Sequence, residues 1–226
     1  MFDKKLIAMI PARLGSQRLK KKNLAPLNGV PLIAHAIRKC FKAGCFDEIW
    51  VNSESEEIAE VARAEGAQFH ARPEKLANNV ATSEDFVAEF FQKHNCEAMY
   101  QVHSIAPLLT ADEVRGFVDN YKQGEYDVLL SCIHDQIEVA YEGKPVNFTF
   151  SEKTNSQDLK PLQRITWSIA AWRREVFLDA IARGEAATYH GRIGFYPVGP
   201  ASGHVIKTQL DLDIAAALMS VTGQAS

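Results

Sequence analysis

The sequence has few cysteines and no long apolar run. Its four cysteines form neither a CxxC pair nor a zinc-binding spacing: Cys40, Cys45, Cys96 and Cys132. Buried, reduced thiols of a cytosolic protein are the simplest interpretation of them. No apolar stretch approaches the ~20 residues of a membrane-spanning helix, and the apolar run near the amino terminus is too short for a signal peptide. These absences predict a cytoplasmic protein without a membrane segment.

The chain also lacks an excess of positive charge. Its net charge is −3, whereas general binding to nucleic acid or to anionic membranes usually needs a broad basic surface. The 46% apolar and 23% charged fractions are ordinary for a globular protein and argue against extended disorder. A chain of 226 residues can bury a substantial core. We therefore expect no nucleic-acid partner and a single domain over residues 1–226.

Segments typical of buried strands alternate with segments of helical periodicity. Strands are predicted at 5–11, 47–52, 67–71, 97–103, 126–133, 164–172 and 192–198. Helices are predicted at 31–43, 53–66, from 82, 112–122, 173–183 and 213–221. Capping boxes mark three of the helix starts: Ser53 with Glu56, Thr82 with Asp85, and Thr110 with Glu113. This order predicts an α/β fold with a mostly parallel sheet and helices on both faces.

The alternation breaks at residues 134–163. This stretch carries Gly143, Pro145 and Pro161 among mixed polar residues, and it lacks the pattern of a strand–helix crossover. It is therefore interpreted as an inserted hairpin and loop, an arm on the single domain.

The loop after the first predicted strand is strongly basic. Ligands of open α/β sheets bind beyond the carboxyl ends of the strands, which makes such loops candidate sites. Residues 12–23 read ARLGSQRLKKKN and match neither GxxxxGK[ST] nor GxGxxG. Gly15 would let the chain turn tightly around an anion, while Arg13 and Lys22 would hold its oxygens. A solvated basic turn is the alternative, and the position directly after a buried strand favours the anion site.

Residues 10–37, IPARLGSQRLKKKNLAPLNGVPLIAHAI, resemble the opening of the CMP-sugar synthetases. These are cytidylyltransferases that activate sialic acids and related nonulosonic or ulosonic acids. The resemblance implies a Rossmann-like nucleotidyltransferase core. It also implies that Arg13 and Lys22 are catalytic and grip the triphosphate of CTP, and that Ser16 and Asn23 lie near the nucleotide.

A second stretch is similar to the family's nucleotide loop. Residues 72–83, RPEKLANNVATS, follow the pattern RP-x-x-LA-x-D-x-x-[ST]S, except that Asn79 stands where many members have aspartate. The resemblance implies that Arg72 and Ser83 read the cytosine ring and the ribose. Polar groups can distinguish cytosine from uracil because its amino group is a donor. The alternative is that Thr82 or Ser83 only caps a helix.

Residues 209–214, QLDLDI, are similar to the family's DIDT-type metal motif. In an extended segment Asp211 and Asp213 would point to the same side and hold one hard cation, for which Mg²⁺ is the expected cofactor. The alternative is that both carboxylates stabilise a helix N-terminus. Ile214 replaces the family's threonine, which weakens the match.

The match is poorest where the family binds its sugar. His103 replaces a glutamine and is either a sugar contact or a hydrogen-bonded histidine at a strand end. Ile105 replaces a metal-binding aspartate of the branch that uses 2-keto-3-deoxyoctonate (KDO), which counts against that branch. Arg164 fits the family pattern and would pair with the sugar carboxylate. Three nearby residues depart from the family's asparagine, glycine and tyrosine: Thr166, Trp167 and Ala170.

The resemblance thus implies a cytidylyltransferase. The anomeric hydroxyl of a small acidic 2-keto-3-deoxy sugar would attack the α-phosphate of CTP in line, and pyrophosphate would leave. The alternatives are a nucleotidyltransferase for a different acceptor and a non-catalytic nucleotide-binding module with a partner role. Family members often form homodimers in which the inserted region reaches the neighbour's sugar site. Residues 134–163 are therefore expected to be a dimerisation arm.

Overall fold

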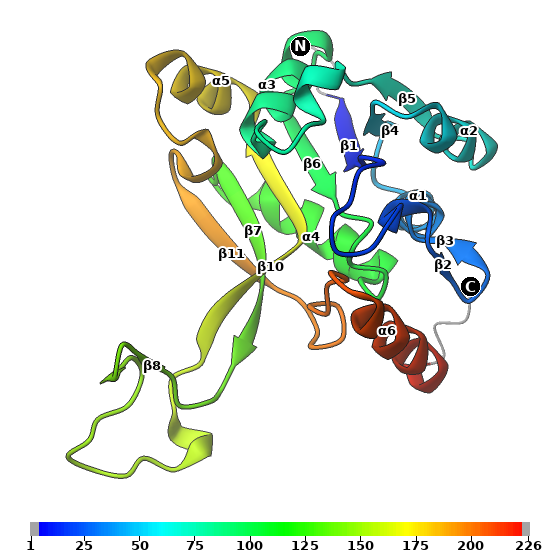
Figure 1. Cartoon of the computed structure of the whole chain (residues 1–226). Helices are drawn as coiled ribbons and strands as arrows, with labels where there is room; N and C mark the ends of the chain where they lie inside the picture. Colours follow the sequence, from blue (N-terminus) through cyan, green and yellow to red (C-terminus); the bar gives the residue numbers. More distant parts are fainter. Residues whose placement is uncertain (1–4, 223–226) are drawn as a thin grey trace.

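A seven-stranded sheet forms the centre of the computed structural model, which describes residues 5–222 (Figure 1). Its strands are β1 (Leu6–Pro11), β4 (Glu48–Ser53), β5 (Gln68–Ala71), β6 (Ala98–Val102), β7 (Val128–Asp135), β10 (Leu162–Arg173) and β11 (Ile193–Pro197). The strand order is β11-β7-β10-β6-β1-β4-β5. Neighbouring strands run parallel except for β10, which is antiparallel to both β6 and β7. The predicted, mostly parallel sheet is confirmed.

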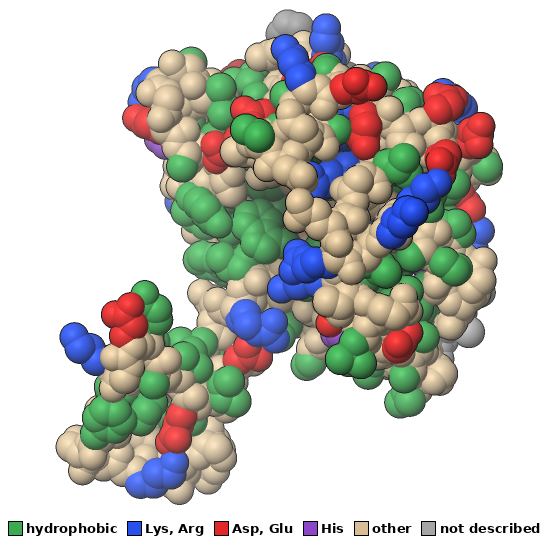
Figure 2. Space-filling model, in the orientation of Figure 1, with side chains coloured by type: hydrophobic (Ala, Val, Ile, Leu, Met, Phe, Trp, Pro, Cys, Tyr) green, Lys and Arg blue, Asp and Glu red, His purple; other side chains and the backbone are tan. Residues whose placement is uncertain are grey.

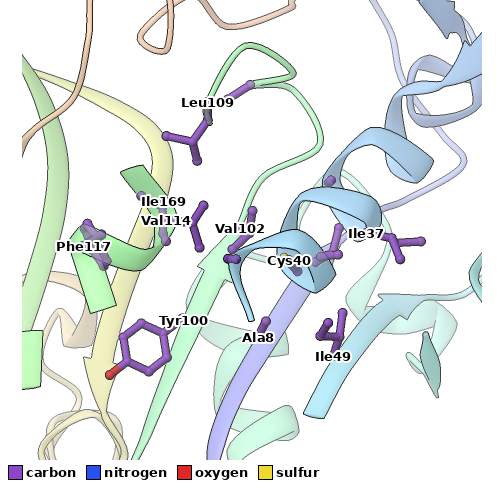
Figure 3. Packing of buried hydrophobic residues seen from close by; sticks show 14 of the residues in the cluster. Ala8, Ile37, Cys40, Ile49, Tyr100, Val102, Leu109, Val114, Phe117 and Ile169 are labelled. Atoms are coloured by element: carbon purple, nitrogen blue, oxygen red, sulfur yellow. The ribbon is translucent and has the colours of Figure 1, made fainter. Parts of the chain in front are cut away.

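Helices cover both faces of this sheet. They are α1 (Leu32–Ala43), α2 (Glu56–Ala64), α3 (Ser83–Lys93), α4 (Ala111–Gln123), α5 (Arg174–Arg183) and α6 (Gln209–Thr222). Helices α1, α2 and α4 share one hydrophobic cluster with the sheet, and α3 and α5 share another. Figure 3 shows part of the first cluster, where Ile37 and Cys40 of α1 lie over Ala8 and Ile49. The prediction of helices on both faces is confirmed.

Strand β1 is apolar throughout because helices cover both of its faces. Ile7 and Met9 belong to the cluster beneath α3 and α5, whereas Ala8 and Ile10 belong to the cluster beneath α1 and α4. Successive side chains of a strand point to opposite faces, so a strand covered on both faces needs apolar residues at every position. The carboxyl end of β1 is thereby anchored from both sides, and the basic loop starts from a rigid support.

Two of the three predicted capping boxes are present. Thr82 and Asp85 cap α3, and Thr110 and Glu113 cap α4, with the reciprocal side-chain and backbone hydrogen bonds of that motif. The box predicted at Ser53 is wrong, because Ser53 ends β4 and helix α2 begins three residues later. Its Oγ accepts a hydrogen bond from the backbone N–H of Ser55 at 3.1 Å and so shapes the turn between strand and helix.

The inserted segment is an arm that projects from the sheet (Figure 1). Its base is the antiparallel continuation of β7 and β10, in which Leu162 pairs with Asp135. At its tip, β8 (Ala140–Tyr141) and β9 (Lys144–Pro145) form a small hairpin. The arm exposes four large hydrophobic side chains: Ile137, Tyr141, Val146 and Phe150. The predicted inserted hairpin is confirmed.

None of the helices within residues 5–222 has the length and apolar character needed to cross a membrane. The prediction about a leader at the amino terminus includes residues 1–4, which lie outside the described part of the chain.

Glu113 ties helix α4 to the loop that precedes α6. Its carboxylate accepts hydrogen bonds from the N–H and hydroxyl of Thr110 (both 2.8 Å), from the N–H of Gly199 (2.7 Å) and from the hydroxyl of Ser202 (2.6 Å). Burial alone would raise the pKa of Glu113, but hydrogen bonds from Ser202, Thr110 and Gly199 outweigh burial and lower this pKa. The charged carboxylate therefore stabilises the folded state.

We expect Glu113→Gln to lower the free energy of unfolding by about 1–3 kcal/mol at pH 7, because a charged acceptor of several hydrogen bonds is lost. A lowered folded-state pKa contributes stability above the unfolded pKa, and this contribution disappears as the pH falls through the folded value. The deficit of the variant should therefore shrink below about pH 4. Urea unfolding followed by circular dichroism measures the free energy of unfolding at each pH. Asp112→Asn is the matched control, since Asp112 is exposed on the same helix; equal deficits in the two variants would contradict the assignment.

Candidate active site

A cavity of about 290 Å³ opens beyond the carboxyl ends of β1 and β6, where an open α/β sheet binds its ligands. Six of the residues predicted for the site line it: Arg13, Ser16, Lys22, Asn23, Arg72 and His103. They come from three separate loops, after β1, after β5 and after β6. The sheet topology brings these loops together because β1 lies between β6 and β4 in the order.

Hydrogen bonds hold the basic loop in shape, and they include one from the N–H of Leu14 to the carboxylate of Glu54 at 2.8 Å. The side chain of Asn23 donates to the carbonyl of Arg13 at 2.8 Å, and its Oδ1 accepts from the hydroxyl of Ser104 at 2.7 Å. Asn23 therefore orients the loop as well as lining the cavity. Gly15 does not adopt a positive φ, and the left-handed residue of the loop is Lys21 (φ 48°). Gly15 lines the cavity without needing a positive φ, and its predicted role in turning the chain around an anion stays a prediction.

The ammonium group of Lys22 lies near other positively charged side chains. Its Nζ donates to the carbonyl of Ile206 at 3.3 Å. Burial, followed by the charges of Arg18 and Arg13, lowers the pKa of Lys22. A group of neighbouring positive charges is stabilised when an anion binds among them. The geometry therefore favours an anion site over a solvated basic turn.

Arg72 is almost fully buried beneath the second loop. Its Nε and NH2 atoms donate to the side chain and backbone oxygens of Asn52 at 2.6 and 2.8 Å, and its guanidinium lies 4.2 Å from the ring centroid of Phe86. Burial lowers the pKa of Arg72 to about 10. Asn52 and Phe86 are neutral, so they position this charge without cancelling it. The NH1 atom of Arg13 donates to the carbonyl of Asn78 (3.0 Å), which joins the two loops.

His103 brings a neutral ring to the cavity. Burial and the charge of Lys22 lower the pKa of His103 to about 4. Its Nε2 atom is buried and has no hydrogen-bond partner among residues 5–222. An unpaired buried ring nitrogen is costly unless a ligand satisfies it. This observation favours a ligand contact over a hydrogen-bonded histidine at a strand end.

Two further predicted residues, Ser83 and Arg164, are not among those that line the cavity. Ser83 is the first residue of α3, and the neighbouring Thr82 is the N-cap, as the capping interpretation of this pair expected. Arg164 lies at the base of the arm, where its Nε donates to Asp135 at 2.5 Å. In this structure its guanidinium is therefore paired within the chain.

The two aspartates proposed for a metal lie in a helix, and the expected extended segment is wrong. In a helix, residues two apart point about 200° apart around the axis. Oδ2 of Asp211 accepts hydrogen bonds from the N–H groups of Lys207 and Thr208 (2.9 and 2.8 Å), while Asp213 accepts from Gln209. Asp211 therefore stabilises the start of α6, as the alternative expected. Within the described residues, no cluster of three or more histidine, cysteine, aspartate or glutamate side chains is placed to hold a metal ion.

The sequence matches a family model described as cytidylyltransferase over residues 7–217. The chain belongs to the cytidylyltransferase family. A pseudaminic acid cytidylyltransferase of Campylobacter jejuni is 32% identical over 168 residues, covering 69% of this chain and 72% of that protein. An N-acylneuraminate cytidylyltransferase of Streptococcus agalactiae is 27% identical over 82% of this chain, and the match spans 47% of that protein. An N-acylneuraminate cytidylyltransferase A of Danio rerio is 32% identical over 56% of this chain, which spans only 30% of that longer protein.

Solved structures of other cytidylyltransferases share the fold of this chain. A CMP:2-keto-3-deoxy-manno-octonic acid synthetase complexed with CTP superposes with a TM-score of 0.72 at 19% identity, covering 97% of this chain and all of that one. A 4-diphosphocytidyl-2C-methyl-D-erythritol synthase of Anaerococcus prevotii gives 0.69 at 11% identity, with 96% and 99% coverage. At such identities the likeness shows the fold alone. The predicted Rossmann-like nucleotidyltransferase core and the predicted CMP-sugar synthetase family are confirmed.

Several residues around the cavity were not predicted from the sequence. Arg18 and Phe86 line it, and Ser104 both lines it and orients Asn23. Arg18 belongs to the basic run and was a visible candidate. Phe86 had no such signal, because an aromatic residue inside an amphipathic helix is typical of a core position.

We expect Lys22→Met to melt at the same temperature as the unchanged protein or higher, without ligand at pH 7. A lowered folded-state pKa means that the protonated lysine costs stability below that pKa, and that this cost fades as the pH rises through it. Scanning calorimetry measures the melting temperature. Lys20→Met is the matched control, since Lys20 is exposed and does not line the cavity. A clear drop in the melting temperature of Lys22→Met alone would show that Lys22 has a structural role.

Proposed function

We propose that the protein transfers CMP from CTP to the anomeric hydroxyl of an acidic 2-keto-3-deoxy sugar, sialic-acid-like or another nonulosonic acid, and releases pyrophosphate. The observation that carries this proposal is the cavity in which Arg13, Lys22 and Arg72 converge, held by neutral groups. Its support is family membership and the names of the relatives, which are cytidylyltransferases for N-acylneuraminate and pseudaminic acid.

In this proposal Arg13 and Lys22 bind the triphosphate and stabilise the negative charge that develops on the leaving pyrophosphate. The acceptor oxygen bonds to the α-phosphorus as the bond to pyrophosphate breaks, and the hydroxyl proton passes to solvent. Such transfer depends mainly on positioning and on charge stabilisation. Arg72, Ser16 and Asn23 contact the nucleoside side of CTP, and Ser83, which lies outside the cavity lining at the start of α3, would contact it only at the margin.

We propose Mg²⁺ as the cofactor; when bound beside the phosphates it would supply positive charge that polarises the α-phosphate. Asp211 fits this role better than Asp213, because the charge of Asp211 acts on Lys22 in the cavity. Asp213 is exposed and points away around the helix. A site with one carboxylate and several phosphate oxygens suits Mg²⁺, which usually keeps waters and takes few protein ligands.

One observation, the pairing of Arg164, favours an acceptor of a different kind. Its pairing with Asp135 leaves the expected partner of a sugar carboxylate occupied within the chain. A nucleotidyltransferase for another acceptor is therefore the second candidate. A non-catalytic nucleotide-binding module is less well supported, because the cavity holds cations beyond those that nucleoside binding needs.

The proposal predicts selective binding of CTP. A ligand that binds only the folded state stabilises it by roughly 2.7 kcal/mol at a hundredfold excess over Kd. We expect CTP with Mg²⁺ to raise the melting temperature more than UTP, ATP or GTP, and Lys22→Met to lose this rise while Lys20→Met keeps it. A pyrophosphate-release assay with sugar acids then measures turnover. Preference for another nucleotide would overturn the cytidine assignment, and binding without turnover of any acceptor would favour the non-catalytic module.

We also propose that the chain forms a homodimer through the arm of residues 134–163. The arm exposes Tyr141 and Phe150, and the rings of Phe148 and Phe150 pack edge to face at 5.6 Å. Large apolar side chains on a projecting hairpin are costly in water and suit an interface between copies.

Light scattering after size exclusion should therefore give twice the mass of the chain. Phe150→Asp should shift the protein toward monomer, because it buries a charge in the proposed interface. Val221→Asp is the matched control, since Val221 is an exposed apolar residue on α6. A monomeric parent protein at micromolar concentration would contradict the dimer.

A further inference from the structure

Trp167 adopts an unusual backbone conformation in strand β10. Its φ is +58°, in the left-handed region that a bulky side chain rarely occupies. The pairing of β10 with β7 shifts register between Ile165 and Ala170, so Trp167 lies in a bulge. Bulges change the direction of side chains, and strained residues persist where their surroundings hold them.

Buried hydroxyl groups hold this bulge. Oγ of Ser131 on β7 accepts hydrogen bonds from the N–H groups of Ser168 and Ile169, each at 3.1 Å, and lies 2.9 Å from the hydroxyl of Thr166. The hydroxyl of Ser168 donates to the carbonyl of Ser202 at 2.7 Å. These contacts fix the backbone on both sides of Trp167, whose ring is only partly buried.

The bulge borders the cavity. The backbone N–H of His103 donates to the carbonyl of Ser168 at 3.1 Å, so the residue after Trp167 is bonded directly to a residue that lines the cavity. The buried Nε2 of His103 has no partner within the described chain. Arg13 and Lys22 line the basic side of the cavity, whereas Trp167 is not a lining residue and adjoins the cavity through the backbone bond between Ser168 and His103.

The surroundings of Trp167 are apolar. Its ring lies 6.3 Å from that of Tyr189, which is half exposed, and Ile165 and Ile193 are partly exposed members of the same cluster. Phe195 pairs in register with Leu130 of that cluster and so shares its face of the sheet. Figure 2 shows hydrophobic side chains gathered left of the centre, over β7, β10 and β11, beside the basic groups.

We infer that Trp167 is a specificity-determining residue that stacks on the acceptor and selects a sugar acid poor in hydroxyl groups on the face turned to the ring. This inference rests on the proposed function. A hydroxyl group set against Trp167 and Tyr189 would lose its hydrogen bonds to water without replacement, whereas a deoxy or methyl-bearing carbon would gain from burial. The neutral ring of His103 supplies a polar contact next to the apolar side chains of Trp167 and Tyr189.

The test compares two acceptors by pyrophosphate release at saturating CTP: N-acetylneuraminic acid and its 9-deoxy analogue. We expect the protein to favour the deoxy acid at least tenfold in kcat/KM. Trp167→Gly should reduce this preference to below threefold by raising KM for the deoxy acid, with the Kd for CTP unchanged. Trp167→Phe, which keeps an aromatic ring, should retain most of the preference.

Measuring the stability of the Trp167→Gly variant separates a role in acceptor selection from a role in folding. Glycine suits a positive φ, so Trp167→Gly should stay folded. Asn28→Gly is the matched control, because Asn28 also has a positive φ (50°) but lies in the turn between β2 (Pro26–Leu27) and β3 (Val30–Pro31). It should leave the preference unchanged.

Equal kcat/KM for the two acids in the parent protein, or turnover of neither while CTP still binds, would overturn the inference and leave the nucleotide half of the proposed function intact. A preference that survives in Trp167→Gly would overturn it as well. Loss of CTP binding by the parent protein would instead overturn the proposed function.

Discussion

Within the described chain, Lys22 and Arg72 hold their positive charges without a directly bonded carboxylate, and this is the constraint around which the site is arranged. Asp211 and Glu54 act on these charges only from a distance. Lys22 contacts a backbone carbonyl, and Arg72 contacts Asn52 and Phe86, all of them neutral groups. Burial lowers the pKa of both side chains, so the free protein carries an unfavourable cluster of cations. A sheet buried on both faces supplies the stability that tolerates this cluster. An anionic ligand relieves the repulsion among these cations. The unfavourable electrostatic energy of the ligand-free protein therefore favours anion binding.

The two sides of the cavity differ in how they are built. The basic side uses loops that follow parallel strands, and their side chains reach the cavity from rigid strand ends. The other side borders β10, the antiparallel strand that returns from the arm. Its bulge brings Ser168, the residue after Trp167, into a backbone hydrogen bond with His103, and a buried network around Ser131 fixes Ser168 there. The basic side, which we propose binds the nucleotide, carries the family's sequence pattern, whereas the side proposed for the acceptor departs from it. This division suits a fold that keeps one substrate and changes the other.

Local patterns were predicted well because their interactions join residues close in sequence. The capping boxes at Thr82 and Thr110 each join residues three apart, and both are present. Two local interpretations were wrong. Ser53 ends a strand and shapes a turn, and Asp211 lies in a helix that begins at Gln209. In both places the sequence is compatible with two conformations, and packing against distant segments selects between them.

The sequence by itself determined the α/β alternation, the inserted arm and the basic loop, because periodicity and charge are properties of neighbouring residues. Only the tertiary structure decided which side chains meet. Asn23 and Ser104 are 81 residues apart, and Lys22 and Ile206 are 184 apart, yet each pair is hydrogen-bonded. The position of Phe86 under Arg72 and the left-handed Trp167 likewise had no sequence pattern. Such contacts depend on how the strands order themselves in the sheet, which is a property of the whole packed chain.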